Sequence, residues 1–97
     1  MPIRLDLNNA EFQKQWFALE KAEQIAVLLT CRKIASIEWD GLYRDKGLRW
    51  ELIHSRRGSD GSKLYSLRIT KQVRAVGCRD GDYLEFLTLH PDHDSAY

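Results

Sequence analysis

Three short runs of alternating apolar and polar residues fill the segment from 64 to 89 and restrict the possible folds more than any other feature. Alternation with a period of two is typical of a strand with one buried face. The Asp80-Gly81 pair between the second and third runs is a strong signal for a tight hairpin. The sequence therefore predicts an antiparallel meander of three consecutive strands.

A tight turn at this hairpin also predicts the register of the last two strands. It pairs small residues with large ones on the side where helices would pack, namely Ala75 with Phe86 and Gly77 with Leu84. Arg74 then lies on the opposite, open face of the sheet, because side chains alternate along a strand. An odd register in the connection from 70 to 73 would place Arg68 beside Arg74.

The first third of the chain predicts a short strand and a capped helix. Residues 3 to 7 alternate as a half-buried strand would. Asn8 or Asn9 can cap the next helix by offering a side-chain oxygen to its free backbone amides. The apolar residues of that helix recur at spacings of four and three and share one face: Phe12, Trp16 and Leu19.

A second helix is predicted from Glu20 to Ile37, ending before two glycine turns. Its expected contacts with the core are Ile25, Leu28, Leu29 and Ile34, and its expected outward residues are Glu23, Gln24, Arg32 and Lys33. Trp39-Asp40-Gly41 and Asp45-Lys46-Gly47 have the composition of turns. A further strand follows, with Leu48, Trp50, Leu52 and His54 expected on one side.

The order strand, helix, helix and four strands defines the expected fold class. We predict an α+β fold in which the N-terminal strand and two helices pack on one face of a mostly antiparallel sheet of four to five strands. Residues 1–97 are expected to form a single domain, since 97 residues is an ordinary length for one core.

Composition excludes few classes of function, but it does bear on nucleic-acid binding, membrane association and cellular location. The net charge of +1 does not by itself indicate a nucleic-acid binder, so such a case depends on where the cations lie. No apolar run approaches the roughly 20 residues that span a bilayer, so we expect no membrane association and a cytoplasmic location. Cys31 and Cys78 match no zinc spacing and are predicted to be buried thiols.

The polar segment after the last strand is the strongest candidate for chemistry. It contains His90, Asp92, His93, Asp94 and Tyr97. Histidine exchanges protons near neutral pH, and an arginine on the adjacent face can hold a phosphate and neutralise developing charge. These are the parts of metal-independent RNA cleavage by a ribose 2′-hydroxyl. An inert tail and a metal site are the alternatives, but no second ligand cluster completes the coordination, so we expect neither metal nor cofactor.

Three motifs together resemble the RelE/ParE superfamily of bacterial toxins. They are the strand pair from Tyr65 to Val76 with its arginine, the turn Asp80-Gly81-Asp82, and the ending His93-Asp94-Ser95-Ala96-Tyr97. Within the superfamily, the chain resembles the branch of RelE-, HigB- and YafQ-like mRNA interferases. The resemblance spans nearly the whole chain and implies the strand, two-helix and four-strand order predicted above.

This resemblance implies roles for individual residues. Arg74 would contact the scissile phosphate with help from Arg68, His93 would act as general acid or base, and Tyr97 would stack on a base or share the proton transfer. Other basic residues are candidates for RNA binding, because arginine forks match phosphate oxygens. They are Arg56, Arg57 and Lys63 of a solvated loop from 55 to 63, and Lys71. His54, His90, Asp92 and Asp94 have no assigned role.

Three functions are compatible with these residues. The first is a toxin endoribonuclease that cleaves mRNA on the ribosome and is silenced by a cognate antitoxin, so mRNA, the ribosome and an antitoxin are the expected partners. The second is a ParE-like inhibitor of DNA gyrase, which would need neither His93 nor Tyr97. The third is a catalytically silent binding module.

Overall fold

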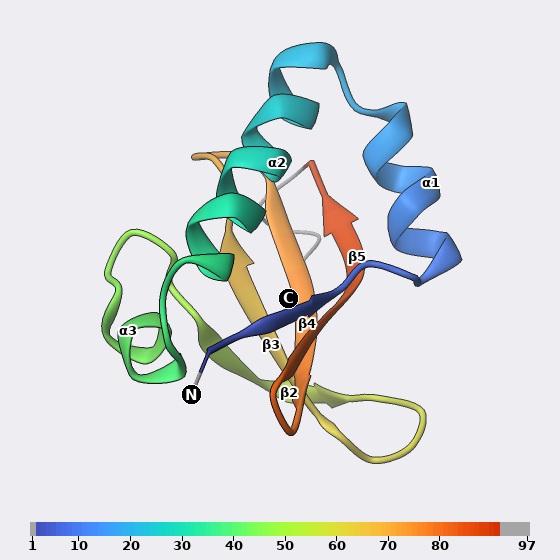
Figure 1. Ribbon diagram of the computed structural model, residues 1–97. Helices are drawn as coiled ribbons and strands as arrows, with labels where there is room; N and C mark the ends of the chain where they lie inside the picture. The colour runs from blue at the N-terminus through green and yellow to red at the C-terminus, as the bar shows by residue number, and fades with distance from the viewer. Residues whose placement is uncertain (1, 92–97) are drawn as a thin grey trace.

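The computed structural model describes residues 2–91, which form three helices and a five-stranded sheet (Figure 1). The elements in chain order are β1 (Arg4–Asp6), α1 (Ala10–Ala18), α2 (Lys21–Ala35), α3 (Trp39–Arg44), β2 (Glu51–Arg57), β3 (Lys63–Arg68), β4 (Arg74–Asp80) and β5 (Tyr83–His90).

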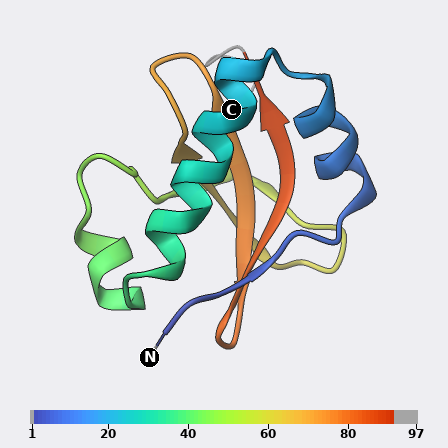
Figure 2. The same ribbon diagram turned by 45° about the horizontal axis from the view of Figure 1, so that its top comes forward.

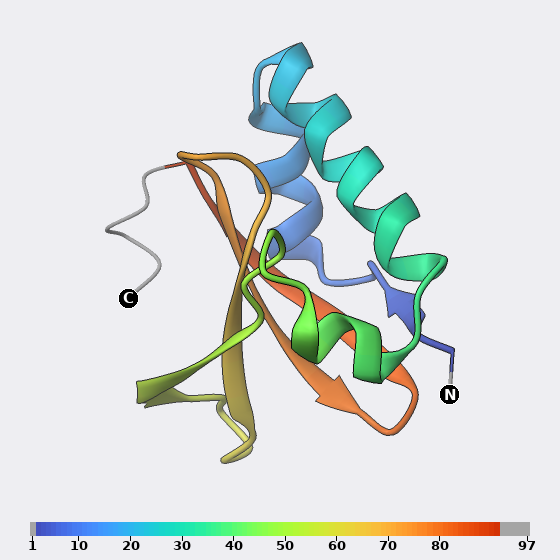
Figure 3. The ribbon, with the colours of Figure 1, turned by 90° about the vertical axis from the view of Figure 1, so that its left-hand side faces the viewer.

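The sheet has the order β1-β5-β4-β3-β2, and only the pairing of β1 with β5 is parallel. The three helices lie on one side of the sheet, and the other side faces away from them (Figure 3). The predicted fold class and the meander of β3, β4 and β5 are therefore confirmed. This arrangement leaves one face of the sheet available for a site.

The first helix begins where the sequence predicts. The Asn9 side chain accepts a hydrogen bond from the backbone N–H of Phe12 at 3.1 Å, which satisfies one of the free amides at the helix start. Phe12 is fully buried and stacks on Phe86 with 5.1 Å between ring centroids. This contact joins α1 to β5, and the two elements lie side by side in Figure 2.

The predicted core face of the second helix is wrong for three of its four residues. Ile25, Leu28 and Leu29 are exposed, while the core contacts come from another stripe of the helix: Val27, Thr30, Cys31 and Ile34. Helix α2 is apolar on two sides, so its pattern does not select which side packs. With Phe17 of α1, the three exposed residues form what we call the outer apolar surface.

A third helix, α3, occupies a stretch that was predicted to be a turn. Trp39 and Leu42 are both buried, and this apolar contact stabilises the helix despite Gly41 within it. The second predicted turn is confirmed, because the Asp45 carboxylate accepts hydrogen bonds from the backbone N–H groups of Gly47 and Leu48, both at 2.9 Å.

The open face of the sheet is partly apolar, which the predicted pattern for residues 48–54 did not include. Ile53 is buried there. It lies on the side of the strand opposite to the one predicted for Leu52 and His54. It belongs to a second cluster, with Leu87 packed against it: Ile53, Leu64, Val76 and Cys78. Cys31 and Cys78 are free and buried as predicted, and burial raises the pKa of each thiol to about 11.

The register of β4 and β5 differs from the prediction by two residues near the turn and by three residues beyond a bulge. Gly77 pairs with Phe86, because the turn is formed by Gly81 and Asp82. Ala75 pairs with Leu89, because a bulge between Val76 and Gly77 adds one more residue to the shift. Gly81 has φ +60°, which glycine adopts without a steric penalty. The extra residue of the bulge lies in β5, so the alternation along β4 is unbroken and the predicted face of Arg74 still holds.

Candidate functional site

Two arginines and a histidine form a row across the open face of the sheet. Arg68 pairs with Arg74 across β3 and β4, and Arg74 pairs with His90 across β4 and β5. Residues directly opposite one another in antiparallel strands have Cβ atoms about 5 Å apart and point to the same face. The three side chains therefore lie next to one another, and Arg68 sits beside Arg74 as predicted.

Arg74 is an unusually buried cation. Only 6% of the residue is exposed, and its Nε is buried with no hydrogen-bond partner. Among the described residues, no carboxylate forms an ion pair with it. A buried charge without a counterion is energetically unfavourable, so an anion that binds to this guanidinium would be stabilised by it.

His90 is placed to exchange a proton next to this cation. Burial lowers the pKa of His90 below its usual range, and the positive charge of Arg56 lowers it further. Its Nε2 lies 2.9 Å from the Thr88 Oγ1, which is a hydrogen-bonding distance. The neutral imidazole is thus favoured in the folded protein, and neutral imidazole can accept a proton.

The depressed pKa of His90 predicts a loss of stability in acid. The unfolded chain, with a histidine pKa of about 6.5, binds more protons than the folded state as the pH falls. The contribution of His90 is therefore present above the unfolded pKa and is lost as the pH falls through the folded one. Melting temperatures measured from about pH 7 to about pH 5 should fall less steeply in His90→Gln than in the wild type. Identical pH profiles would show that burial of His90 has no effect on stability.

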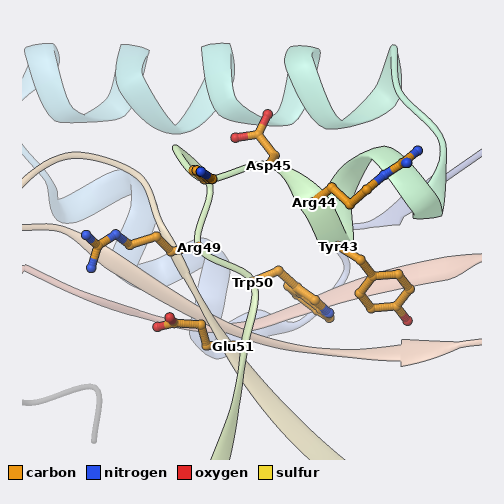
Figure 4. Close-up of a pocket in the computed structure, with 7 residues that line it drawn as sticks. Tyr43, Arg44, Asp45, Arg49, Trp50 and Glu51 are labelled. Carbon is orange, nitrogen blue, oxygen red and sulfur yellow. The ribbon is translucent and has the colours of Figure 1, made fainter.

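A surface pocket of about 350 Å³ lies beside the N-terminal end of β2 (Figure 4). Its lining combines three basic residues, two aromatic ones and two carboxylates: Tyr43, Arg44, Asp45, Lys46, Arg49, Trp50 and Glu51. The Asp45 carboxylate is occupied by an ion pair of 2.9 Å with Lys33, so it does not neutralise the pocket cations. No motif in the sequence pointed to this pocket, because its residues come from a helix, a turn and a strand.

Comparison with solved structures identifies the architecture that carries these residues. The archaeal RelE–RelB complex from Pyrococcus horikoshii contains a chain that superposes with a TM-score of 0.66 at 18% identity, over 94% of this chain and 96% of that one. The chain has a RelE-like fold. A copper-bound mutant toxin from Helicobacter pylori superposes with a TM-score of 0.56 at 20% identity, over the full length of both chains. No protein-family profile and no curated protein matches the sequence.

In this RelE-like fold, the basic residues predicted to bind RNA are divided between two regions. Arg56 lies near enough to His90 to affect its proton affinity, whereas Arg57 and Lys63 pair with each other at the far end of β2 and β3. Lys63 is five residues from Arg68 along β3, which corresponds to about 16 Å. The predicted loop from 55 to 63 is shorter than expected, since Arg56, Arg57 and Lys63 belong to strands.

The remaining predicted positions have no defined place in the site. Lys71 is exposed in the connection between β3 and β4, and His54 is exposed on β2. Asp92, His93, Asp94 and Tyr97 lie outside the described residues. Within residues 2–91, no group of three or more histidine, cysteine or acidic side chains could hold a metal ion. None of the helices in that same range has the length and apolar character needed to cross a bilayer.

Proposed function

We propose that this protein is the toxin of a toxin–antitoxin pair and acts as an endoribonuclease that cleaves mRNA on the ribosome. The observation that carries the proposal is the buried, unpaired Arg74 at the centre of the row formed with Arg68 and His90. The RelE-like fold supports the toxin role, because one similar solved structure is a RelE–RelB complex and another is described as a toxin.

The proposed reaction needs no metal. The ribose 2′-hydroxyl attacks the adjacent phosphorus, the bond to the 5′-oxygen breaks, and the products are a 2′,3′-cyclic phosphate and a free 5′-hydroxyl. Arg74 binds the scissile phosphate and neutralises the charge that accumulates on it, and Arg68 holds the backbone next to it. His93 acts as general acid or base, and Tyr97 stacks on a base or shares the proton transfer.

A cognate antitoxin is the proposed protein partner. One of the similar structures is a RelE–RelB complex, and the outer apolar surface provides a matching feature on this chain. Phe17 is 67% exposed and Leu28 is 55% exposed, and both line an apolar pocket between α1 and α2. Clustered apolar exposure of this kind is typical of a surface that another protein covers.

Expression in bacteria with transcript 5′ ends mapped tests the proposal. We expect the wild type to arrest growth and to produce cuts inside translated codons, and His93→Ala to lose both effects because a proton-transfer group is missing. Cuts that persist in His93→Ala would exclude the role given to His93. Growth arrest with intact transcripts and DNA damage would instead indicate a gyrase inhibitor, and absence of arrest would indicate a silent binding module.

A further inference from the structure

Arg49 is held in a backbone conformation that non-glycine residues rarely adopt. Its φ is +50°, and among the described residues it alone combines a positive φ with a side chain. The neighbours on either side, Leu48 and Trp50, are both buried in the main core, while Arg49 is exposed. Strained conformations persist where the surrounding structure imposes them, and they cluster at functional sites.

The strand register brings Arg49 next to Arg68. Glu51 pairs with Ser66, and the Arg68 N–H donates a hydrogen bond of 2.7 Å to the Leu48 carbonyl. Arg49 lies between these two contacts in the sequence, so it is opposite Arg68 at the end of β3. Arg49 therefore lies about two strand spacings, or about 10 Å, from Arg74.

The side chain of Arg49 points toward the open face. In Figure 4, Arg49 and Glu51 extend to one side of their segment, while Trp50 and Tyr43 extend to the other. Ser66 and Arg68 flank Leu67, which is buried in the core on the helix side, so Ser66 and Arg68 lie on the open face. Glu51 pairs with Ser66 and therefore shares that face. Arg49, two residues before Glu51 and on the same side, lies at the end of the same row.

The charge of Arg49 is available to a ligand. Within residues 2–91, neither Glu51 nor any other carboxylate forms an ion pair with it. A row of arginines that crosses neighbouring strands can contact successive phosphates of a single strand, since each fork binds phosphate oxygens in a bidentate manner.

We propose that Arg49 is a second phosphate-binding arginine, which holds the RNA strand on the β2 side of the scissile phosphate bound by Arg74. The inference rests on the proposed ribonuclease function and extends it to a residue that no sequence motif indicated. The row of RNA contacts then runs from Arg49 through Arg68 to Arg74.

Binding of a short single-stranded RNA with 2′-O-methyl groups, which cannot be cleaved, tests this inference. Fluorescence anisotropy over a range of salt concentrations should be compared for the wild type, Arg49→Gln and Arg49→Gly. We expect both variants to bind roughly tenfold more weakly. The slope of log affinity against log salt should decrease by about 0.7, which corresponds to one lost phosphate contact on a single strand. Arg49→Gly should keep or raise the melting temperature, because glycine accepts a positive φ.

Arg44→Ala is the matched control, since Arg44 lines the same pocket but lies on α3. It should retain the affinity and the salt slope of the wild type. Wild-type affinity and slope in both Arg49 variants would overturn the inference and leave the ribonuclease proposal intact. A wild type that binds no RNA at low salt would also overturn it, and transcript mapping then decides separately whether the ribonuclease proposal survives.

Discussion

Arg74→Ala is expected to reduce the rate of mRNA cleavage by about 100- to 1,000-fold, the usual effect of removing one preorganised group that stabilises transition-state charge. The guanidinium is buried at the centre of the row and its Nε makes no hydrogen bond, so its removal takes away the proposed phosphate contact. Cleavage of a defined message on purified ribosomes provides the measurement. Arg74→Lys should retain part of the activity, because lysine keeps the charge but lacks the bidentate fork.

Arg32→Ala serves as the control for this experiment. Arg32 is an exposed arginine on α2, and the helices lie on the opposite side of the sheet from the row. Its removal should leave cleavage unchanged. A melting temperature near that of the wild type would establish that Arg74→Ala is folded. Cleavage at the wild-type rate in Arg74→Ala would exclude this residue from the site.

Phe86→Ala is expected to lower the free energy of unfolding by about 3 to 5 kcal/mol, as truncation of a buried aromatic side chain does. Phe86 is fully buried, and its ring stacks on that of Phe12 with an interplanar angle of 11°. The substitution would leave a cavity between α1 and the sheet. Because domains of this size have a total stability of about 5 to 15 kcal/mol, a large part of the stability would be lost. Urea denaturation measures the change.

Phe17→Ala is the matched comparison, since it removes the same side chain from an exposed position on α1. A change within about 0.5 kcal/mol is expected there. Equal losses in the two variants would mean that Phe17 is also packed in solution, for instance against a second chain, and would contradict its exposure on this one.

Local patterns predicted the strands and the helix start because those features depend on neighbouring residues. Asn9 caps α1 through the amide three residues later, and the alternation around Arg74 specified its face of the sheet. The predicted face is correct despite the error in register, because the extra residue of the bulge lies in β5 and leaves the alternation along β4 unchanged. An odd register in the connection from 70 to 73 was the condition that predicted Arg68 beside Arg74.

Features that depend on distant residues were not predictable in the same way. Helix α2 is apolar on two sides, and only its packing on the sheet decides that Val27 and Ile34 are buried while Leu28 is exposed. Helix α3 forms at a sequence with turn composition because Trp39 is buried in the core.

The sequence by itself determined the class of fold, the order of the strands along the chain and the open face that carries Arg74. Those properties follow from periods of two and from spacings of three and four residues, which act over short stretches of chain. Only the tertiary structure decided that Arg74 is buried without a partner and that Arg49 lies beside Arg68. Burial and cross-strand proximity depend on contacts between residues far apart in the sequence, and local patterns do not predict those contacts.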